Sequence, residues 1–263
     1  MCVAIACIGN QTPSRQELIR GCIANPDGFG WGVVYFDGQY YDLEWNKTMD
    51  GETAIDEYLA TVERLGDSVV ASAFHARIAT HGGTNLPNCH PFPVGGDERT
   101  LLFHNGMLPI SAEGGRSDTR IFAEDVLPTM GGVTALEQPV LLDMVSNWAK
   151  GSKLVVLSID PAVEYSLTIV NEDDGFWTDN VWFSNSSCQP YTASKWNGTL
   201  TKVAALQNVC PVCDQSVEPL DEVCSICWSC LDCELPSEDC LCYSSTPRII
   251  DAVDTFGWDV EAF

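Results

Sequence analysis

The chain has 263 residues, 45% of them hydrophobic, and a formal net charge of -24 with only five lysines. This apolar content is ample for a packed core and excludes a wholly disordered or fibrous chain. So much negative charge would repel phosphate backbones and anionic lipids, so we expect no direct nucleic-acid binding. No run approaches the roughly 20 apolar residues of a membrane span, and no basic leader segment opens the chain, so we expect no membrane association.

The first quarter of the chain predicts a strand, a helix, a hairpin and a second helix. A strand-like apolar run covers residues 3–7, and Ser14 with Glu17 forms a capping pattern that predicts a short helix over 14–24. Residues 31–43 read as a hairpin that turns at Asp-Gly. Residues 53–65 have the apolar period of a helix that lies on a sheet.

An apolar strand begins near Val69 and runs into a polar segment. Alternation along this strand would place His75, Arg77, Ala79 and His81 on one face, up to the flexible pair Gly82-Gly83. Polar side chains at the end of a strand that leads into a loop are typical of functional sites. An edge strand with a solvated arginine and core histidines is the alternative.

The middle of the chain predicts two more helices, over 118–127 and 136–148, and three strands, over 154–159, 165–171 and 180–184. Residues 110–115 read as an exposed loop. Strands early and late with helices between them favour an α+β fold with layered sheets and helices, although periodicity alone does not fix its topology.

Two further segments carry candidate chemistry. Removal of Met1 would make Cys2 the first residue, and its own α-amine could take the thiol proton to give a reactive thiolate. An apolar strand then ends in His104-Asn105-Gly106. A side-chain amide beside an exposed backbone N–H suits an oxyanion hole, although Asn-Gly more often marks a tight turn.

Five motifs in a fixed order give the chain a family resemblance. Met-Cys at the start, His-x-Arg-x-Ala-Thr-His-Gly, Asn-x-His-Pro, His-Asn-Gly and Ser-Asp-Thr resemble the class II glutamine amidotransferases, which are glutaminase domains of the N-terminal-nucleophile (Ntn) hydrolase fold. The run Asn-Pro-Asp-Gly-Phe-Gly-Trp-Gly from Asn25 is similar to the compact, stand-alone branch. The resemblance implies a four-layer αββα sandwich over residues 1–205.

The resemblance also implies roles for individual residues. Cys2 would be the nucleophile, and Asn105 and Gly106 would hold the oxyanion. Arg77 would bind the α-carboxylate of L-glutamine and Asp118 its α-ammonium, although Asp118 could equally serve the start of a helix. Thr80, His81 and Gly82 would line the pocket, while His90 and His104 would hold loops in place. Many relatives with fused synthases have Trp where this chain has Ile78.

The composition changes abruptly near residue 206. Eight of the thirteen cysteines lie in close pairs, which suits metal binding in a reducing compartment and therefore predicts a cytoplasmic protein. They could fill one or two closed, zinc-ribbon-like sites, with an iron–sulfur cluster or a disulfide knot as alternatives. The candidate ligands are Cys210, Cys213, Cys224, Cys227, Cys230, Cys233, Cys240 and Cys242. The sequence does not fix their pairing.

We therefore expect three parts: a glutaminase domain over residues 1–205, a cysteine-rich zinc module over 206–246 and an acidic tail over 247–263. The expected reaction converts L-glutamine to glutamate and ammonia through a γ-glutamyl thioester, with no cofactor needed, and a separate enzyme would accept the ammonia. One alternative is an amidohydrolase that cleaves a γ-glutamyl or other amide. Another is a non-catalytic assembly protein on the same fold.

Overall fold

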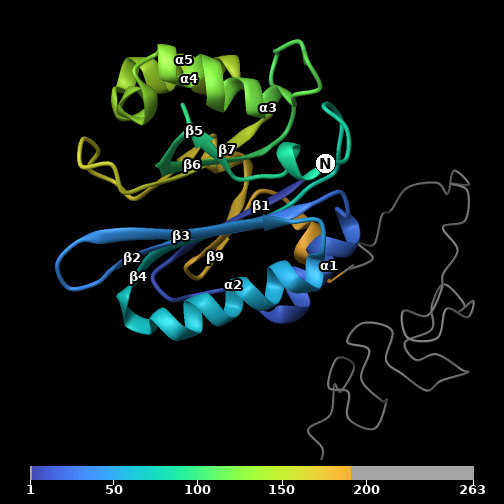
Figure 1. The fold of residues 1–263 in the computed structure, drawn as a ribbon, viewed down its shortest axis with the longest axis vertical. Helices are drawn as coiled ribbons and strands as arrows, with labels where there is room; N and C mark the ends of the chain where they lie inside the picture. Colours follow the sequence, from blue (N-terminus) through green and yellow to red (C-terminus); the bar gives the residue numbers. More distant parts are fainter. Residues whose placement is uncertain (1, 191–263) are drawn as a thin grey trace, which may run out of the picture. The chain divides into compact units, whose positions relative to one another are not determined.

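The computed structural model describes residues 2–190. The cysteine-rich segment, the predicted boundaries near 205 and 246 and the acidic tail lie outside that range, so those predictions remain predictions. The fold within the described range is built on two antiparallel sheets, which pack face to face between two layers of helices (Figure 1). The α+β prediction of sheets layered with helices is therefore confirmed for this part of the chain.

The first sheet contains strands from both ends of the described range. Its order is β3-β2-β4-β1-β10-β9, so the chain returns at its end to pair with the strand on which it began. The strands are β1 (Val3–Ile8), β2 (Phe29–Phe36), β3 (Tyr41–Thr48), β4 (Val69–Ala76), β9 (Phe176–Thr178) and β10 (Val181–Phe183). The predicted hairpin corresponds to β2 and β3.

The second sheet is formed by the middle of the chain in the order β5-β6-β7-β8. Its strands are β5 (Phe92–Val94), β6 (Asp97–Asn105), β7 (Lys153–Ser158) and β8 (Leu167–Val170). Asn105 is the last residue of β6 and pairs with Lys153. The predicted oxyanion residue therefore stands at the end of an interior strand of this sheet.

Helices α1 (Arg15–Ala24) and α2 (Gly51–Leu65) cover the outer face of the first sheet (Figure 1). The predicted capping box starts α1, because the Ser14 hydroxyl accepts from Glu17 N–H and the Glu17 carboxylate accepts from Ser14 N–H. Such a cap contributes about 1 kcal/mol. Tyr58 of α2 is fully buried against the sheet, as the apolar period predicts.

The outer face of the second sheet is covered by a broken set of helices: α3 (Asp118–Ile121), the π-helical turn η3 (Phe122–Val126), α4 (Leu127–Thr129), the 3-10 turn η4 (Gly132–Glu137) and α5 (Pro139–Trp148). The helix predicted over 118–127 is present, but its middle part, η3, is a π-helical turn rather than regular α-helix. The wide turn η3 interrupts the regular hydrogen bonding, and Pro128, which has no N–H, follows it in α4. Four short 3-10 turns complete the fold: η1 (Gly66–Ser68), η2 (Leu86–Asn88), η5 (Glu172–Asp174) and η6 (Ser186–Cys188).

The space between the sheets is filled by small and large apolar side chains from their facing sides. Ala4, Ala71 and Ala73 of the first sheet meet Leu101 and Phe103 of the second. Small residues on one sheet let the large side chains of the other reach across. Alternation then directs Cys2, two residues before Ala4, toward this same space.

The strand that carries His75 is shorter than predicted. It was expected to continue to the glycine pair, but β4 ends at Ala76. Ala76 pairs with Val3 and with Phe29, the first residues of β1 and β2, so the sheet pairing on both sides of β4 ends there. The backbone instead bonds to the loop before β2, where Arg77 N–H donates to Gly28 C=O at 2.8 Å. Ala79 and His81 consequently lie in a loop rather than on a strand face.

The described part of the chain has neither a membrane-spanning helix nor a metal-binding cluster. Among residues 2–190, no helix has both the length and the apolar character needed to cross a membrane. Within the same residues, no group of three or more histidine, cysteine or acidic side chains could hold a metal ion. The eight cysteines predicted to bind zinc lie beyond residue 190, so this result does not bear on them.

Candidate active site

Cys2 lies just before β1, with its thiol against the segment that follows β4. The Ile78 N–H donates to Cys2 Sγ at 3.3 Å, and the thiol lies 3.4 Å from Ile78 C=O. Burial raises the pKa of the Cys2 thiol, while the Ile78 N–H and the positive charge of Arg77 act in the opposite direction. Burial therefore favours the protonated form of this thiol.

A small cavity lies beside this thiol. Its free volume is about 20 Å³, which is room for about one water molecule and far too little for an amino acid. Its lining brings together six of the eight residues predicted to act on or bind the substrate: Cys2, Arg77, Thr80, His81, Gly106 and Asp118. Residues distant in sequence thus meet at one point between β4, β6 and α3.

Arg77 and Asp118 both bond to other protein groups in this structure. The Arg77 guanidinium donates to the carbonyls of His81 and Gly83, at 2.8 Å each. The Asp118 carboxylate accepts from Leu108 N–H and from Thr119 N–H, at 2.8 Å each. The N-cap of α3 is Ser117, so the alternative of a capping role for Asp118 is wrong. The two groups predicted to bind free glutamine are thus both engaged internally.

Asn105 is the last residue of β6, an interior strand of the second sheet, and Gly106 follows it, so the strand ends as predicted. Asn105 Nδ2 donates to Ser184 Oγ at 2.8 Å, whereas Asn105 Oδ1 is buried and meets no hydrogen-bond partner within residues 2–190. Ser184 Oγ already accepts from Ala4 N–H, so its own proton is free to donate. If the amide were turned over, Oδ1 would accept that proton and the NH₂ group would be released for an incoming oxygen.

Glycine is required at Gly106 and Gly82 for conformational and steric reasons. Gly106 has a φ of 143°, and a Cβ there would overlap Ser152. Gly82 has a φ of 77°, and its added Cβ would lie 2.6 Å from Ser117 N. Gly82 was predicted to line the pocket, but it is not among the residues that line the cavity. It instead lets the loop after β4 pack closely against the start of α3.

The sequence did not identify Asn88, which ties three segments of the site together. Its side-chain amide donates to the carbonyls of Gly82 and Gly115, and its Oδ1 accepts from Ser117 N–H at 3.0 Å. The side chain is 1% exposed. The motif Asn-x-His-Pro contains this residue, but the motif does not indicate which distant backbone groups the side chain contacts.

Asp27 was also missed, because the run from Asn25 that contains it was used only for the family resemblance. Its carboxylate accepts from Ala79 N–H at 2.8 Å, and its own N–H donates to Arg77 C=O at 2.8 Å. The loop before β2 therefore fixes the backbone on both sides of Ile78, whose N–H contacts the thiol.

Three buried histidines surround the inner side of the site. The rings of His75 and His90 lie 3.9 Å apart between centroids, and His104 Nδ1 lies 2.7 Å from Thr119 Oγ1. Burial lowers the pKa of His75 to about 3 and that of His104 to about 4. Burial also lowers the pKa of His90 well below its ordinary value. All three imidazoles are therefore neutral at pH 7.

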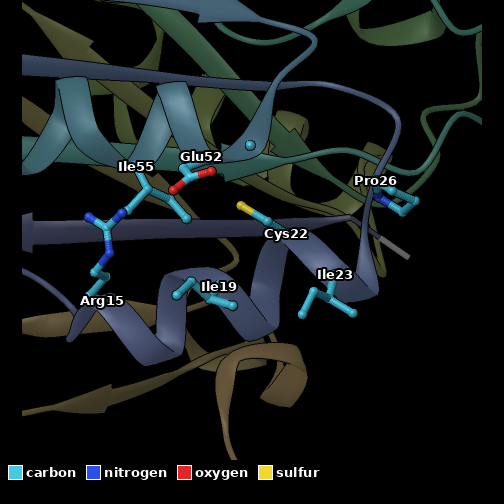
Figure 2. Close-up of a pocket in the computed structure, with 8 residues that line it drawn as sticks. Arg15, Ile19, Cys22, Ile23, Pro26, Glu52 and Ile55 are labelled. Carbon is cyan, nitrogen blue, oxygen red and sulfur yellow. The ribbon is translucent and has the colours of Figure 1, made fainter. Parts of the chain in front are cut away.

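A larger hollow of about 490 Å³ lies elsewhere, between α1 and α2 (Figure 2). Its walls are mainly apolar, with Ile19, Ile23 and Ile55 beside the Cys22 thiol, whose pKa burial raises to about 12. A thiol of that pKa is a poor nucleophile at pH 7. The chemistry of the Cys2 cavity makes it the better candidate active site despite its smaller volume.

Comparison with known proteins finds a family match over part of the chain. Residues 15–120 match the family of class-II glutamine amidotransferases. The match includes Arg77, Asn105 and Asp118 but not Cys2, so the placement of Cys2 rests on the structure. No curated protein matches the chain.

Several solved structures are similar at low identity. A glutamine phosphoribosylpyrophosphate amidotransferase from B. subtilis, with ADP and GMP, is 15% identical, with a TM-score of 0.38. An allosteric regulatory enzyme of purine biosynthesis is 16% identical with the same TM-score. Each similarity covers 72% of this chain and 42% of the other, so the chain spans less than half the length of either protein. A class-II domain protein from Silicibacter pomeroyi is 15% identical, with a TM-score of 0.29 over 69% of this chain and 87% of that one.

Proposed function

We propose that the chain is a class II glutamine amidotransferase of the Ntn-hydrolase type, which hydrolyses L-glutamine to glutamate and ammonia. The observation that carries the proposal is the convergence of Cys2, Arg77, Gly106 and Asp118 on one cavity. The family match over residues 15–120 supports it, because three of these four residues fall inside the matched range. The alternative of a non-catalytic assembly protein gives no reason for this convergence.

The proposed reaction begins with the loss of whatever precedes Cys2, which leaves its α-amine free. The amine takes the thiol proton, and the thiolate attacks the side-chain carbonyl of glutamine. Gly106 N–H and the Asn105 amide stabilise the resulting oxyanion. As the C–N bond breaks, the amine returns its proton and ammonia leaves. Water then attacks the γ-glutamyl thioester and releases glutamate and the thiol.

Glutamine binding must open the cavity, since its volume of about 20 Å³ cannot hold the substrate. The two carbonyls that Arg77 contacts belong to His81 and Gly83, in the exposed loop that follows β4. A substrate carboxylate would replace them with a charge-assisted, two-pronged partner, which is the stronger acceptor for a guanidinium. Release of these carbonyls would free the loop to move outward.

The test of this function is the intact mass of the purified full chain, before and after incubation with 6-diazo-5-oxonorleucine, a glutamine-like electrophile. We expect loss of Met1 and one covalent adduct, together with glutaminase activity. Cys2→Ala should abolish both the adduct and the activity. Cys22→Ala is the matched control, because that buried thiol lies between α1 and α2 and its loss should leave the adduct intact.

Retention of Met1 without an adduct would contradict the proposal and favour the assembly role. An adduct at Cys2 together with cleavage of γ-glutamyl amides in preference to glutamine would instead support the alternative amidohydrolase. Arg77 and Asp118 fit glutamine and γ-glutamyl compounds alike, because both present a free α-carboxylate and a free α-ammonium, so only the measured preference separates these two alternatives.

Two features of the proposal concern residues and partners outside the described range. We propose that the eight cysteines from Cys210 to Cys242 bind one or two structural zinc ions, because their close pairs suit tetrahedral thiolate sites. Elemental analysis of the purified chain should then give one or two zinc ions per molecule. We also propose that a separate enzyme accepts the ammonia, and its identity would come from co-purification with the native protein.

A further inference from the structure

The three buried histidines have more hydrogen-bonding groups than the protein satisfies. Across residues 2–190, no protein group bonds to His75 Nδ1, to either ring nitrogen of His90 or to His104 Nε2. His90 is 3% exposed and His104 is 2% exposed. A buried polar atom without a partner is costly, and such atoms in native proteins usually mark a bound water, ion or ligand.

His90 is the most unusual of the three. A neutral imidazole has one donor and one acceptor nitrogen, and on His90 both lack a protein partner within the described range. Its ring packs against His75 and, at 4.8 Å between centroids, against Phe92. An apolar ring would make the same contacts without the polar penalty. The prediction that His90 holds a loop in place is therefore not matched by any hydrogen bond of its side chain.

The location of these groups suggests what they bind. His90 and His104 both line the cavity beside Cys2, whose volume of about 20 Å³ suits one molecule the size of water. In the proposed reaction, two molecules of that size come into contact with the γ-glutamyl thioester. Ammonia leaves when the thioester forms, and water attacks it afterwards.

We propose that His90 and His104 form a binding site for one small neutral molecule that both donates and accepts hydrogen bonds, next to the γ-glutamyl thioester on Cys2. Its occupant is the departing ammonia or the attacking water. This inference rests on the proposed function and extends it, because it assigns a positioning role to two histidines that the reaction on Cys2 does not itself require.

The charges around the site keep the two imidazoles neutral. Burial and the positive charges of Arg77 and Lys47 disfavour a protonated His90. Burial and Lys153 act in the same direction on His104, whereas Asp118 opposes them. Neutral imidazoles of such low pKa orient ammonia or water through hydrogen bonds but do not remove a proton from them. Of the charged groups that line the cavity, Arg77 disfavours an ammonium ion there, whereas Asp118, whose carboxylate already accepts from two N–H groups, favours one.

The experiment measures how the thioester partitions between reaction with ammonia, which re-forms glutamine, and reaction with water, which gives glutamate. The full-length enzyme receives glutamine together with ¹⁵N-ammonium chloride, and the rate of ¹⁵N entry into glutamine is compared with the rate of glutamate formation. His90→Phe keeps the ring contacts and removes both nitrogens, while His90→Gln restores a donor and an acceptor. Phe92→Leu is the control for packing alone.

We expect His90→Phe to change the exchange-to-hydrolysis ratio at least fivefold and His90→Gln to restore much of it. A fall in the ratio identifies ammonia as the occupant. A rise, with a longer-lived thioester in acid-quenched mass spectra, identifies water. An unchanged ratio in folded His90→Phe, or the same change in Phe92→Leu, would overturn the site. Absence of any thioester in the unmodified enzyme would instead overturn the proposed function, and the site with it.

A second measurement covers the case in which His90→Phe does not fold. In the unmodified protein labelled with ¹⁵N-histidine, ammonium chloride added near pH 9 should shift the imidazole nitrogens of His90 and His104. Sodium chloride at the same ionic strength should leave them in place. Equal spectra with the two salts, and no solvent contact from water to these imidazoles, would overturn the proposal.

Discussion

The space between the two sheets has an apolar end and a polar end, and the same strands supply both. Along β4, Ala71 and Ala73 face the other sheet before His75 does, and along β6, Leu101 and Phe103 precede Asn105. The apolar end is filled by hydrocarbon side chains from both sheets. The polar end contains several buried atoms that no other group in the described residues satisfies.

Within one strand, the residues at the apolar end stabilise the fold, whereas the residues at the polar end form the candidate site. At the apolar end, each side chain gains free energy by leaving water, at about 25 cal/mol per Å² of apolar surface. At the polar end, burial of unpaired imidazole and amide groups opposes folding. A fold keeps such groups when they serve a site and the rest of the core compensates. Changes that affect the two ends differently therefore test this account.

Acid should have the largest effect, and it should act at the polar end. Burial lowers the pKa of His75 to about 3 and that of His104 to about 4, from an ordinary value of 6.5. Below pH 6.5 these histidines are protonated in the unfolded chain but stay neutral in the folded chain. The free energy of unfolding is therefore highest above pH 6.5 and decreases as the pH falls through this value. Between pH 7 and pH 5 we expect a loss of about 2 kcal/mol for each of the three histidines.

Urea unfolding at pH 7, 6 and 5 would measure this loss. The matched variant is His90→Phe, which should reduce the slope of stability against pH by about one third, because burial also lowers the pKa of His90. Stability that is constant from pH 7 to pH 5 in the unmodified protein would show that the histidines are hydrated in the folded state.

Two glycines on β2 allow the same substitution at both ends. A Cβ at Gly30 would overlap the backbone carbonyl of His90, which is rigid. A Cβ at Gly32 would lie 3.1 Å from Leu101 Cδ1 and 3.2 Å from Leu157 Cδ1, which are the ends of flexible side chains. We expect Gly30→Ala to destabilise the fold by about 3 kcal/mol and Gly32→Ala by less than about 1 kcal/mol. Thermal unfolding of both variants would measure the difference, and equal losses would contradict this picture of the two ends.

Ser184→Ala tests how the polar end positions the oxyanion group. The hydroxyl accepts from Ala4 N–H at 2.9 Å and contacts Asn105 Nδ2 at 2.8 Å, so its loss leaves two buried donors unpaired. We expect a loss of about 2 kcal/mol in stability. In the proposed reaction, a misplaced Asn105 should also lower kcat at least tenfold with little change in KM. Ser184→Thr should retain both properties, and normal kcat in a destabilised Ser184→Ala would restrict the serine to a structural role.

The parts of the fold that follow from local sequence were predicted well. Ser14 and Glu17 cap α1, the period over residues 53–65 gives α2, and the hairpin at 31–43 corresponds to β2 and β3. The early end of β4 was not predicted, because it depends on where the neighbouring β1 begins. The segment Phe122–Val126 has the apolar pattern of a regular α-helix, so its sequence does not indicate the π-helical turn.

The candidate site divides in the same way between local and long-range information. The motifs identify Cys2, Arg77 and Asp118, and the structure places them at one cavity. The supporting contacts of Asn88 and Ser184 join segments up to 180 residues apart, as in the Ala4–Ser184 hydrogen bond. Their partners are mainly backbone atoms, which any residue type offers. Such contacts leave no pattern in a single sequence.

His90→Phe should have the smallest effect on stability, and its sign is informative. The substitution keeps a ring between His75 and Phe92 and removes two buried nitrogens that lack protein partners in residues 2–190. If the site is dry, an apolar ring of similar shape should stabilise the fold by about 1 kcal/mol at pH 7. If His90 holds a water in the resting enzyme, the loss of those hydrogen bonds should offset this gain, and the stability should be unchanged or slightly lower. Urea unfolding of the variant, with Phe92→Leu as the packing control, therefore reports whether the polar end is occupied between reaction cycles.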